Sequence, residues 1–280
     1  MFTINPFTEL AASIPSSVMQ AYVVLMFFLV VGGTLLDTIH KKSARYFFEN
    51  AKKAQESASR SVSSGEKASL AIQTVTSEVL TSSEFANPKR RISHLFTMYG
   101  FILFVATTAI MIFGYSNVGD TTPGIWPILW HLGALMLCFG GYWFWFGIRV
   151  DLAAEGNPWY RFVRADMFIL SLLATCTFAL IWSATQGSTA GWLFFALFIL
   201  SSTILFGGVL WSKFAHMFFK PAAAYQKRVT KADGSRENLP ADFDLTDSAV
   251  QKQFPDIPEY MGTNPPNMGL GIKRESPNHY

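Results

Sequence analysis

Five apolar stretches, each roughly 20 residues long, are the feature that most limits the folds available to this chain. The stretches cover residues 18–39, 92–115, 125–148, 167–184 and 191–211. Residues 95–115 contain no Asp, Glu, Lys or Arg, and a helix of about 20 apolar residues can cross about 30 Å of hydrocarbon. Trp residues near several ends are typical of an interfacial aromatic belt. The pattern predicts an all-α membrane protein, a bundle of five transmembrane helices.

The composition agrees with a protein that has lipid as its main environment. Charged residues make up 15% of the 280-residue chain, whereas soluble domains usually contain about 25%. Half of the residues are hydrophobic, and these include 26 Phe and 8 Trp. The net charge of +3 is too small to indicate nucleic acid as a partner, so we expect a lipid bilayer and no nucleic acid.

The positions of the basic residues predict how the bundle is oriented. Ten Lys or Arg lie within 41–91, three within 149–164 and nine from 213 onward, which accounts for all 22. The other connections and the start of the chain contain none, namely 1–40, 116–124 and 185–190. Because basic residues stay on the cytoplasmic side, we expect the N-terminus outside and the C-terminus in the cytoplasm. The expected location is the bacterial inner membrane, as a multi-pass protein.

Four parts of the chain follow from this topology. Residues 1–40 hold the outer N-terminus and the first transmembrane helix, and residues 92–217 hold transmembrane helices two to five. Residues 41–91 are rich in Ala, Ser, Lys and Glu, which predicts a helical cytoplasmic loop that ends near Asn87-Pro88. Residues 218–280 include seven of the 13 prolines, so we expect an extended cytoplasmic tail that binds a partner.

Two histidines are expected at the same depth near the cytoplasmic face. His94 lies at the start of the second apolar stretch, and His216 follows the end of the fifth. Two neutral imidazoles that face each other across neighbouring helices can ligate one haem iron axially, as in b-type cytochromes. The alternative is a pair of interfacial histidines that hydrogen-bond to lipid headgroups or loops. On the first interpretation, His94 and His216 are the axial ligands of one haem b.

Other polar residues near the apolar stretches have weaker assignments. Lys213, Arg91 and Arg149 are candidates to bind the haem propionates, because they are cations expected on the same side. His131 lies in the outer half of the third stretch and can either hydrogen-bond a quinone or serve as a packing residue. His40, which precedes Lys41, is a fallback haem ligand or an interfacial anchor.

No constellation typical of a catalytic chain is present. The sequence has no GxGxxG or Walker loop and no recognisable Ser/His/Asp spacing. The two cysteines, Cys138 and Cys176, are too few for an iron–sulfur cluster, which needs about four ligands. We expect both to be small packing residues rather than a bridged pair. An electron-transfer subunit fits these absences better than an enzyme with its own active site.

Two motifs resemble helices of a known family. Residues 93–101 (SHLFTMYGF) and 212–217 (SKFAHM) resemble the corresponding helices of five-helix cytochrome b subunits. That family includes the gamma subunit of respiratory nitrate reductase and the C subunit of the quinone-interacting oxidoreductase complex. The resemblance covers roughly residues 18–225 in helix count and topology. Overall the chain looks most like the membrane anchor of dissimilatory adenylylsulfate reductase.

The resemblance implies a function and also limits it. It implies a membrane subunit that docks a cytoplasmic iron–sulfur flavoprotein and transfers electrons between that enzyme and the quinone pool, through haem b. Two-haem members of the family carry another histidine about five turns earlier on the last helix, where this chain has Phe198. One haem is therefore the most that is expected. Two alternatives remain: a cofactor-free membrane anchor for the same enzyme, and a transporter, which the uncharged helices and the lack of an inverted repeat disfavour.

Overall fold

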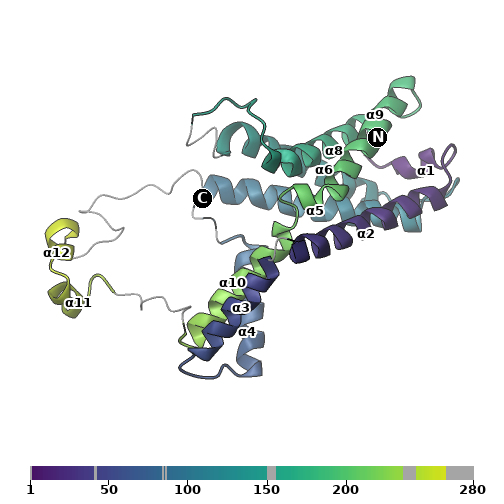
Figure 1. The fold of residues 1–280 in the computed structure, drawn as a ribbon. Helices are drawn as coiled ribbons and strands as arrows, with labels where there is room; N and C mark the ends of the chain where they lie inside the picture. Colours follow the sequence, from purple (N-terminus) through teal and green to yellow (C-terminus); the bar gives the residue numbers. More distant parts are fainter. Residues whose placement is uncertain are drawn as a thin grey trace.

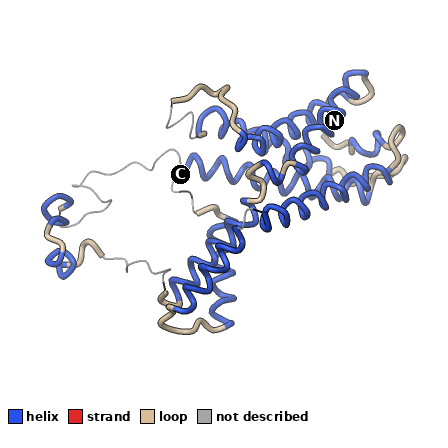
Figure 2. Tube along the Cα trace, in the orientation of Figure 1, coloured by secondary structure: helices blue, strands red, loops and turns tan. Residues whose placement is uncertain are grey.

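The computed structural model describes residues 2–40, 43–83, 85, 87–149, 156–235 and 244–262. For residues 43–48, 260 and 261 it describes the backbone but not the side chains. Within these ranges the chain is helical and contains no strand (Figures 1 and 2). The prediction of an all-α protein is confirmed for this part of the chain.

Five helices of the described chain are long and apolar enough to cross a membrane. They are α2 (Ser16–His40), α5 (Pro88–Gly114), α6 (Ile125–Trp143) continued by the π-helix η2 (Phe144–Ile148), α8 (Met167–Thr185) preceded by the 3-10 turn η3 (Arg164–Asp166), and α9 (Thr189–Gly207). They correspond to the five predicted stretches. These are the features of a multi-pass membrane protein.

Many of the exposed side chains on the long helices are large and apolar, which suits a lipid environment. On α2, Phe27, Phe28 and Leu36 have exposed fractions of 64%, 62% and 54%. Such a large apolar surface is rare on a soluble monomer, whereas lipid tails solvate it without cost. The helix contacts the rest of the bundle through α9 and α5 and presents the rest of its surface outward.

Glycines allow α5 and α6 to pack closely. A Cβ atom added at Gly100 would lie 2.8 Å from the carbonyl oxygen of Gly133, and one added at Gly140 would lie 2.6 Å from that of Ser93. The Ser93 hydroxyl donates a hydrogen bond of 2.8 Å to the Gly140 carbonyl across this contact. Small residues and interhelical hydrogen bonds are the usual means by which membrane helices associate. The sequence therefore brings these two backbones together directly.

At one end of the bundle, aromatic rings fill the space between helices. We call this the opposite end; there the short helix α1 (Pro6–Leu10) covers the core (Figure 1). Trp130 of α6 is fully buried and stacks on Phe104 of α5 with ring centroids 5.2 Å apart. Trp182 of α8 stacks on Phe198 of α9 at 5.7 Å, and Phe7 of α1 contacts both Trp rings. The rings connect α1 and four of the long helices into one core.

At the other end, which we call the basic end, a group of shorter helices projects from the bundle. This group, the head, consists of α3 (Ser43–Glu56), α4 (Ser64–Thr74), the π-helix η1 (Val75–Leu80) and α10 (His216–Ala232). Figure 1 shows α3, α4 and α10 side by side, and α10 contacts both α3 and α4. The head therefore joins two segments that are far apart in the sequence.

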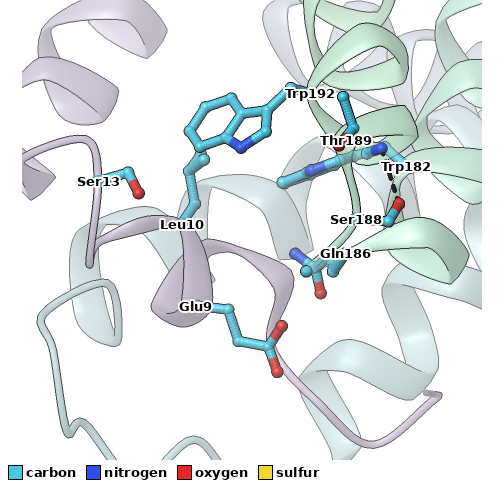
Figure 3. Close-up of a pocket in the computed structure, with 10 residues that line it drawn as sticks. Glu9, Leu10, Ser13, Trp182, Gln186, Ser188, Thr189 and Trp192 are labelled. Carbon is cyan, nitrogen blue, oxygen red and sulfur yellow. Dashed lines mark hydrogen bonds between the residues drawn. The ribbon is translucent and has the colours of Figure 1, made fainter.

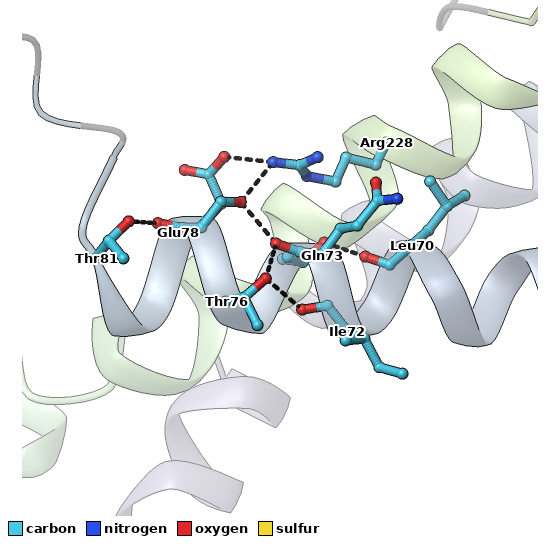
Figure 4. Close-up of polar contacts among 9 residues, drawn as sticks. Leu70, Ile72, Gln73, Thr76, Glu78, Thr81 and Arg228 are labelled. Atoms are coloured by element: carbon cyan, nitrogen blue, oxygen red, sulfur yellow. Dashed lines mark hydrogen bonds and ion pairs between the residues drawn. The ribbon is translucent and has the colours of Figure 1, made fainter.

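Polar contacts hold α10 in the head. Arg228 of α10 donates to the Glu78 carboxylate at 2.9 Å and to the Ser77 hydroxyl at 2.7 Å (Figure 4). The backbone NH groups of Ser59 and Arg60 donate to the Asp233 carbonyl at 2.9 and 3.2 Å. The boundary that we expected between residues 217 and 218 thus falls inside a helix that packs on its own chain.

The last transmembrane helix ends earlier than the apolar pattern indicates. The stretch was expected to run to Trp211, with His216 following its end, but α9 stops at Gly207. Gly208 caps it, and a Cβ there would lie 2.5 Å from the Ile204 carbonyl oxygen. A 3-10 turn, η4 (Val209–Trp211), follows, and His216 begins α10. The adjacent Gly207 and Gly208 lower the helix propensity at this point.

The C-terminal part of the described chain contains two short helices. These are α11 (Ser248–Gln253) and α12 (Asp256–Met261), which contact each other and are drawn apart from the bundle in Figure 1. The carboxylate of Asp247 caps α11 by accepting from the Ala249 NH at 2.8 Å. The expected tail beyond residue 262 lies outside the described residues.

Candidate functional site

The two histidines singled out from the sequence line one cavity at the basic end. This histidine cavity has a volume of about 270 Å³ and lies where α5, α8 and α10 meet. Its polar lining consists of Glu78, His94, Thr97, His216 and Lys220. Its apolar lining is contributed mainly by Met98, Phe101, Ile102, Phe168 and Leu172. An apolar site with few convergent polar groups is the usual form of a small-molecule or cofactor site.

His94 is held in place by a buried serine. It lies in the second turn of α5, which begins at Pro88 and is capped by the Asn87 side chain through the Lys89 and Arg90 NH groups. The His94 Nδ1 atom is 3.0 Å from the Ser82 hydroxyl, and its ring packs on Phe85 with centroids 4.9 Å apart. These contacts fix the direction of the imidazole.

Ser82 adopts a backbone conformation that is uncommon for a residue with a side chain. Its φ angle is +48°, in the left-handed region that favours glycine. The residue is also fully buried. Backbone strain of this kind often accompanies functional sites, where the surrounding structure imposes it. Here the strained turn puts the hydroxyl beside His94.

His216 is oriented by the backbone of its own turn. As the first residue of α10, it hydrogen-bonds through Nδ1 to the Lys213 carbonyl. A carbonyl only accepts, so Nδ1 carries the proton, and a neutral imidazole then has its lone pair on Nε2. That is the tautomer that binds metals, with the second nitrogen held by a carbonyl. Phe168 of α8 packs edge-on against the ring at 5.7 Å.

The side chains that line the cavity are of the kinds that bind a haem b, but the cavity is small for a haem. Two imidazoles and an apolar lining are the donor set and environment of a bis-histidine haem. The volume of about 270 Å³ is slightly below the roughly 300–1,000 Å³ of typical small-molecule sites. A porphyrin therefore requires lining side chains to move, and the unbranched Met98 and Met217 are the ones best able to do so.

The three cations expected at the propionates do not line the histidine cavity. Arg91 Nε donates to the Thr81 carbonyl at 2.7 Å, and Lys213 is exposed. Arg149 forms a buried ion pair with Asp166 at 2.5 Å and lies 4.2 Å from the Trp145 ring centroid. Arg149 thus ties η2 to η3, which sequence position alone does not indicate.

Lys220 is the basic side chain that the sequence analysis missed. It lines the cavity, and its Nζ lies 5.2 Å from the Phe85 ring centroid. Residues four apart share one face of a helix, so Lys220 and His216 are neighbours on α10. The spacing of four residues between His216 and Lys220 is present in the sequence. It indicates a shared helix face only if a new helix begins at His216.

His131 is enclosed between helices of the opposite end. It is 1% exposed, and its Nδ1 donates to the Pro127 carbonyl at 2.7 Å. Its Nε2 then accepts from the Ser183 hydroxyl at 2.8 Å. This is the arrangement of the packing residue that we named as the alternative, and the quinone role stays a prediction.

A second, larger cavity opens at the opposite end. Its volume is about 460 Å³, and it lies between α1 and the connection from α8 to α9 (Figure 3). Glu9, Trp182, Gln186 and Trp192 are among its lining residues, and Gln186 Nε2 donates to the Pro6 carbonyl at 2.9 Å. The lining contains no histidine or cysteine among the residues described.

No protein-family model, no curated protein and no solved structure matches this chain.

Proposed function

We propose that this chain is the membrane subunit of a redox complex, in which His94 and His216 ligate one haem b. In this proposal it docks a cytoplasmic iron–sulfur flavoprotein, similar to adenylylsulfate reductase, and carries electrons between that enzyme and the quinone pool. The observation that carries the proposal is the shared cavity. Two imidazoles 122 residues apart, on α5 and α10, line the same apolar space.

The proposed orientation puts this cavity on the side of the soluble partner. All 22 Lys and Arg belong to segments 41–91, 149–164 and 213 onward, and basic residues favour the cytoplasmic side. The head would then project into the cytoplasm of a bacterium, with the chain in the inner membrane. The head and the segment after it are the proposed docking elements, since they carry most of the charged side chains.

Several residues in and around the cavity have a defined task in this proposal. When bound, a haem supplies a one-electron carrier between the partner and the lipid phase. Ser82 and the Lys213 carbonyl hold the imidazoles in position through their Nδ1 atoms. Lys220 is the candidate to bind a propionate. The lining Phe and Leu side chains exclude water, which together with the axial ligands sets the reduction potential.

The cavity volume favours a second candidate, the cofactor-free anchor. About 270 Å³ is less than a porphyrin occupies, so the space can equally be left to lipid or to packing adjustments. In that case the head alone would carry the function, by holding the soluble enzyme at the membrane. Docking is common to both candidates, and only the first requires the histidines.

A pyridine haemochrome spectrum of the purified chain separates the two candidates. We expect a b-type spectrum with one haem per chain, and loss of that spectrum in His94→Ala and in His216→Ala. The matched control is His40→Ala, because His40 is exposed at the end of α2 and does not line the cavity. Haem-free protein from haem-replete cells, still able to retain the soluble enzyme, would contradict the first candidate and support the second.

A further inference from the structure

The two cysteines of the chain meet in the middle of the membrane-spanning bundle. Cys138 of α6 and Cys176 of α8 have their sulfur atoms 3.3 Å apart. Cys176 lies nine residues from each end of α8 (Met167–Thr185). We predicted packing residues rather than a bridged pair, and both cysteines are free thiols in the structure. The contact between the two thiols was not predicted.

The helices approach closely at this level. A Cβ atom added at Gly141, one turn after Cys138, would lie 2.7 Å from Cδ2 of Leu173, which is one turn before Cys176. Ala134 and Ala179 are fully buried one turn away on the other side. Small residues on both sides therefore hold the two backbones near each other. A disulfide has an S–S length of about 2.04 Å, so the sulfurs need to approach by about 1.3 Å.

One thiol is accessible from the lipid, and the other is enclosed. Cys176 is fully buried, whereas Cys138 is only partly buried. Leu135 and Tyr142 lie one turn on either side of Cys138 on the same face of α6, and both are exposed. A reagent dissolved in the bilayer can therefore reach the Cys138 sulfur, while one dissolved in water meets several turns of apolar helix at either end.

A short chain of hydroxyl groups begins at the accessible thiol. Cys138 Sγ is 3.7 Å from the Thr177 hydroxyl, and that hydroxyl is 2.9 Å from the Tyr142 hydroxyl. Tyr142 lies one turn nearer the basic end than Cys138. These groups can accept and pass on a proton released when the thiol reacts, in a region where no water is expected.

From these contacts we propose that Cys138 and Cys176 are a redox-active dithiol, which a lipid-soluble two-electron acceptor of the quinone class oxidises to a disulfide. Both S–H bonds break and one S–S bond forms. The two electrons and two protons released reduce one quinone to one quinol. Dithiothreitol returns the disulfide to two thiols by exchange and is itself oxidised to its cyclic disulfide. The disulfide joins α6 to α8 covalently within one chain.

The test uses the full chain in lipid nanodiscs. The protein is reduced with dithiothreitol, freed of excess reductant under anaerobic conditions and mixed with decylubiquinone. Thiols are then counted by maleimide labelling in denaturant, and the intact mass is measured. We expect two labelled thiols before the quinone and none after it, with the loss of two hydrogen atoms and one quinol formed per chain.

Single variants and a haem-independent control complete the test. Cys138→Ser and Cys176→Ala should each keep one labelled thiol after quinone treatment and form no quinol, and the apolar replacement suits the fully buried position. The variant His94→Ala/His216→Ala should oxidise its thiols like the unmodified chain, so the outcome does not depend on haem. Two labelled thiols after excess quinone, or a disulfide found only between two chains on a non-reducing gel, would overturn the proposal.

Discussion

At the opposite end of the bundle aromatic rings pack together beside a cavity with no histidine among its described lining residues, whereas at the basic end two histidines line the cavity. At the opposite end Trp130 is fully buried, and the neighbouring His131 has both ring nitrogens hydrogen-bonded within the chain. At the basic end, α9 ends at Gly207, and His94 and His216 line the histidine cavity. The contrast teaches that polarity alone does not mark a site. At the opposite end the ring nitrogens of His131 are bonded within the chain, whereas at the basic end two imidazoles line a cavity.

The largest effect should come from the aromatic core. Trp130→Ala removes the ring that stacks on Phe104 and the hydrogen bond from its Nε1 to Thr108 at 2.9 Å. We expect a loss of about 4 kcal/mol in the free energy of unfolding, as for other buried Trp-to-Ala changes. Titration of the detergent-solubilised protein with SDS measures it. The control is Trp192→Ala, half exposed at the same end, with a loss under about 1 kcal/mol. Equal losses of stability in Trp130→Ala and Trp192→Ala would mean that the buried aromatic core contributes no more than the exposed ring.

A somewhat smaller effect is expected at the basic end from the Arg149–Asp166 pair. Arg149→Met leaves the buried Asp166 carboxylate without its cation. Breaking one side of a buried ion pair usually costs about 3 kcal/mol or more. The double variant Arg149→Met/Asp166→Asn should recover much of the loss, because no uncompensated charge remains. The same SDS titration applies. A double variant no more stable than the single one would mean that packing, and not charge, explains the loss.

The cavity itself should contribute less to stability. Ser82→Ala removes the hydroxyl beside His94 Nδ1 without changing the backbone requirement at φ +48°. We expect a loss of about 1 kcal/mol, the usual net value of one hydrogen bond. In haem-containing protein we also expect a shifted reduction potential, since a ligand's outer hydrogen bond tunes the metal. Ser83→Ala, one residue later and exposed, is the control and should change neither quantity. Identical results for both variants would remove Ser82 from the site.

The smallest effect concerns the exposed surface of the head. The pKa of Glu66 lies below its usual value of 4.5, mainly because Arg60 donates hydrogen bonds to its carboxylate. A lowered pKa in the folded state contributes stability above pH 4.5, and this contribution disappears as the pH falls through the lower folded value. Because the pair is exposed, solvent screens it. Melting temperatures from pH 3 to pH 7 should show slightly less acid sensitivity in Glu66→Gln than in Glu56→Gln, an exposed glutamate of α3. A large difference would mean that the pair is not screened.

The interior of the histidine cavity shows where sequence reasoning was incomplete. The His94–His216 pair was predicted from equal depth, and both residues do line one cavity. The predicted cations Arg91, Arg149 and Lys213 do not line it. Arg91 bonds to the Thr81 carbonyl, Arg149 is paired with Asp166, and Lys213 is exposed. Lys220 was overlooked because the apolar pattern hid the break at Gly208 and the start of α10. The distance between the Cys138 and Cys176 sulfurs was likewise inaccessible, since it depends on how α6 and α8 rotate against each other.

What could be read from the residues alone is the set of five spanning helices and the gathering of basic residues in particular segments. Both follow from solvation, because a bilayer requires long apolar helices and excludes charge. Which side chains meet was decided only by tertiary packing. A one-residue shift in where α9 ends rotates everything after it by about 100°, and no local pattern carries that information. The cavity, the buried ion pair and the cysteine contact all depend on such rotations.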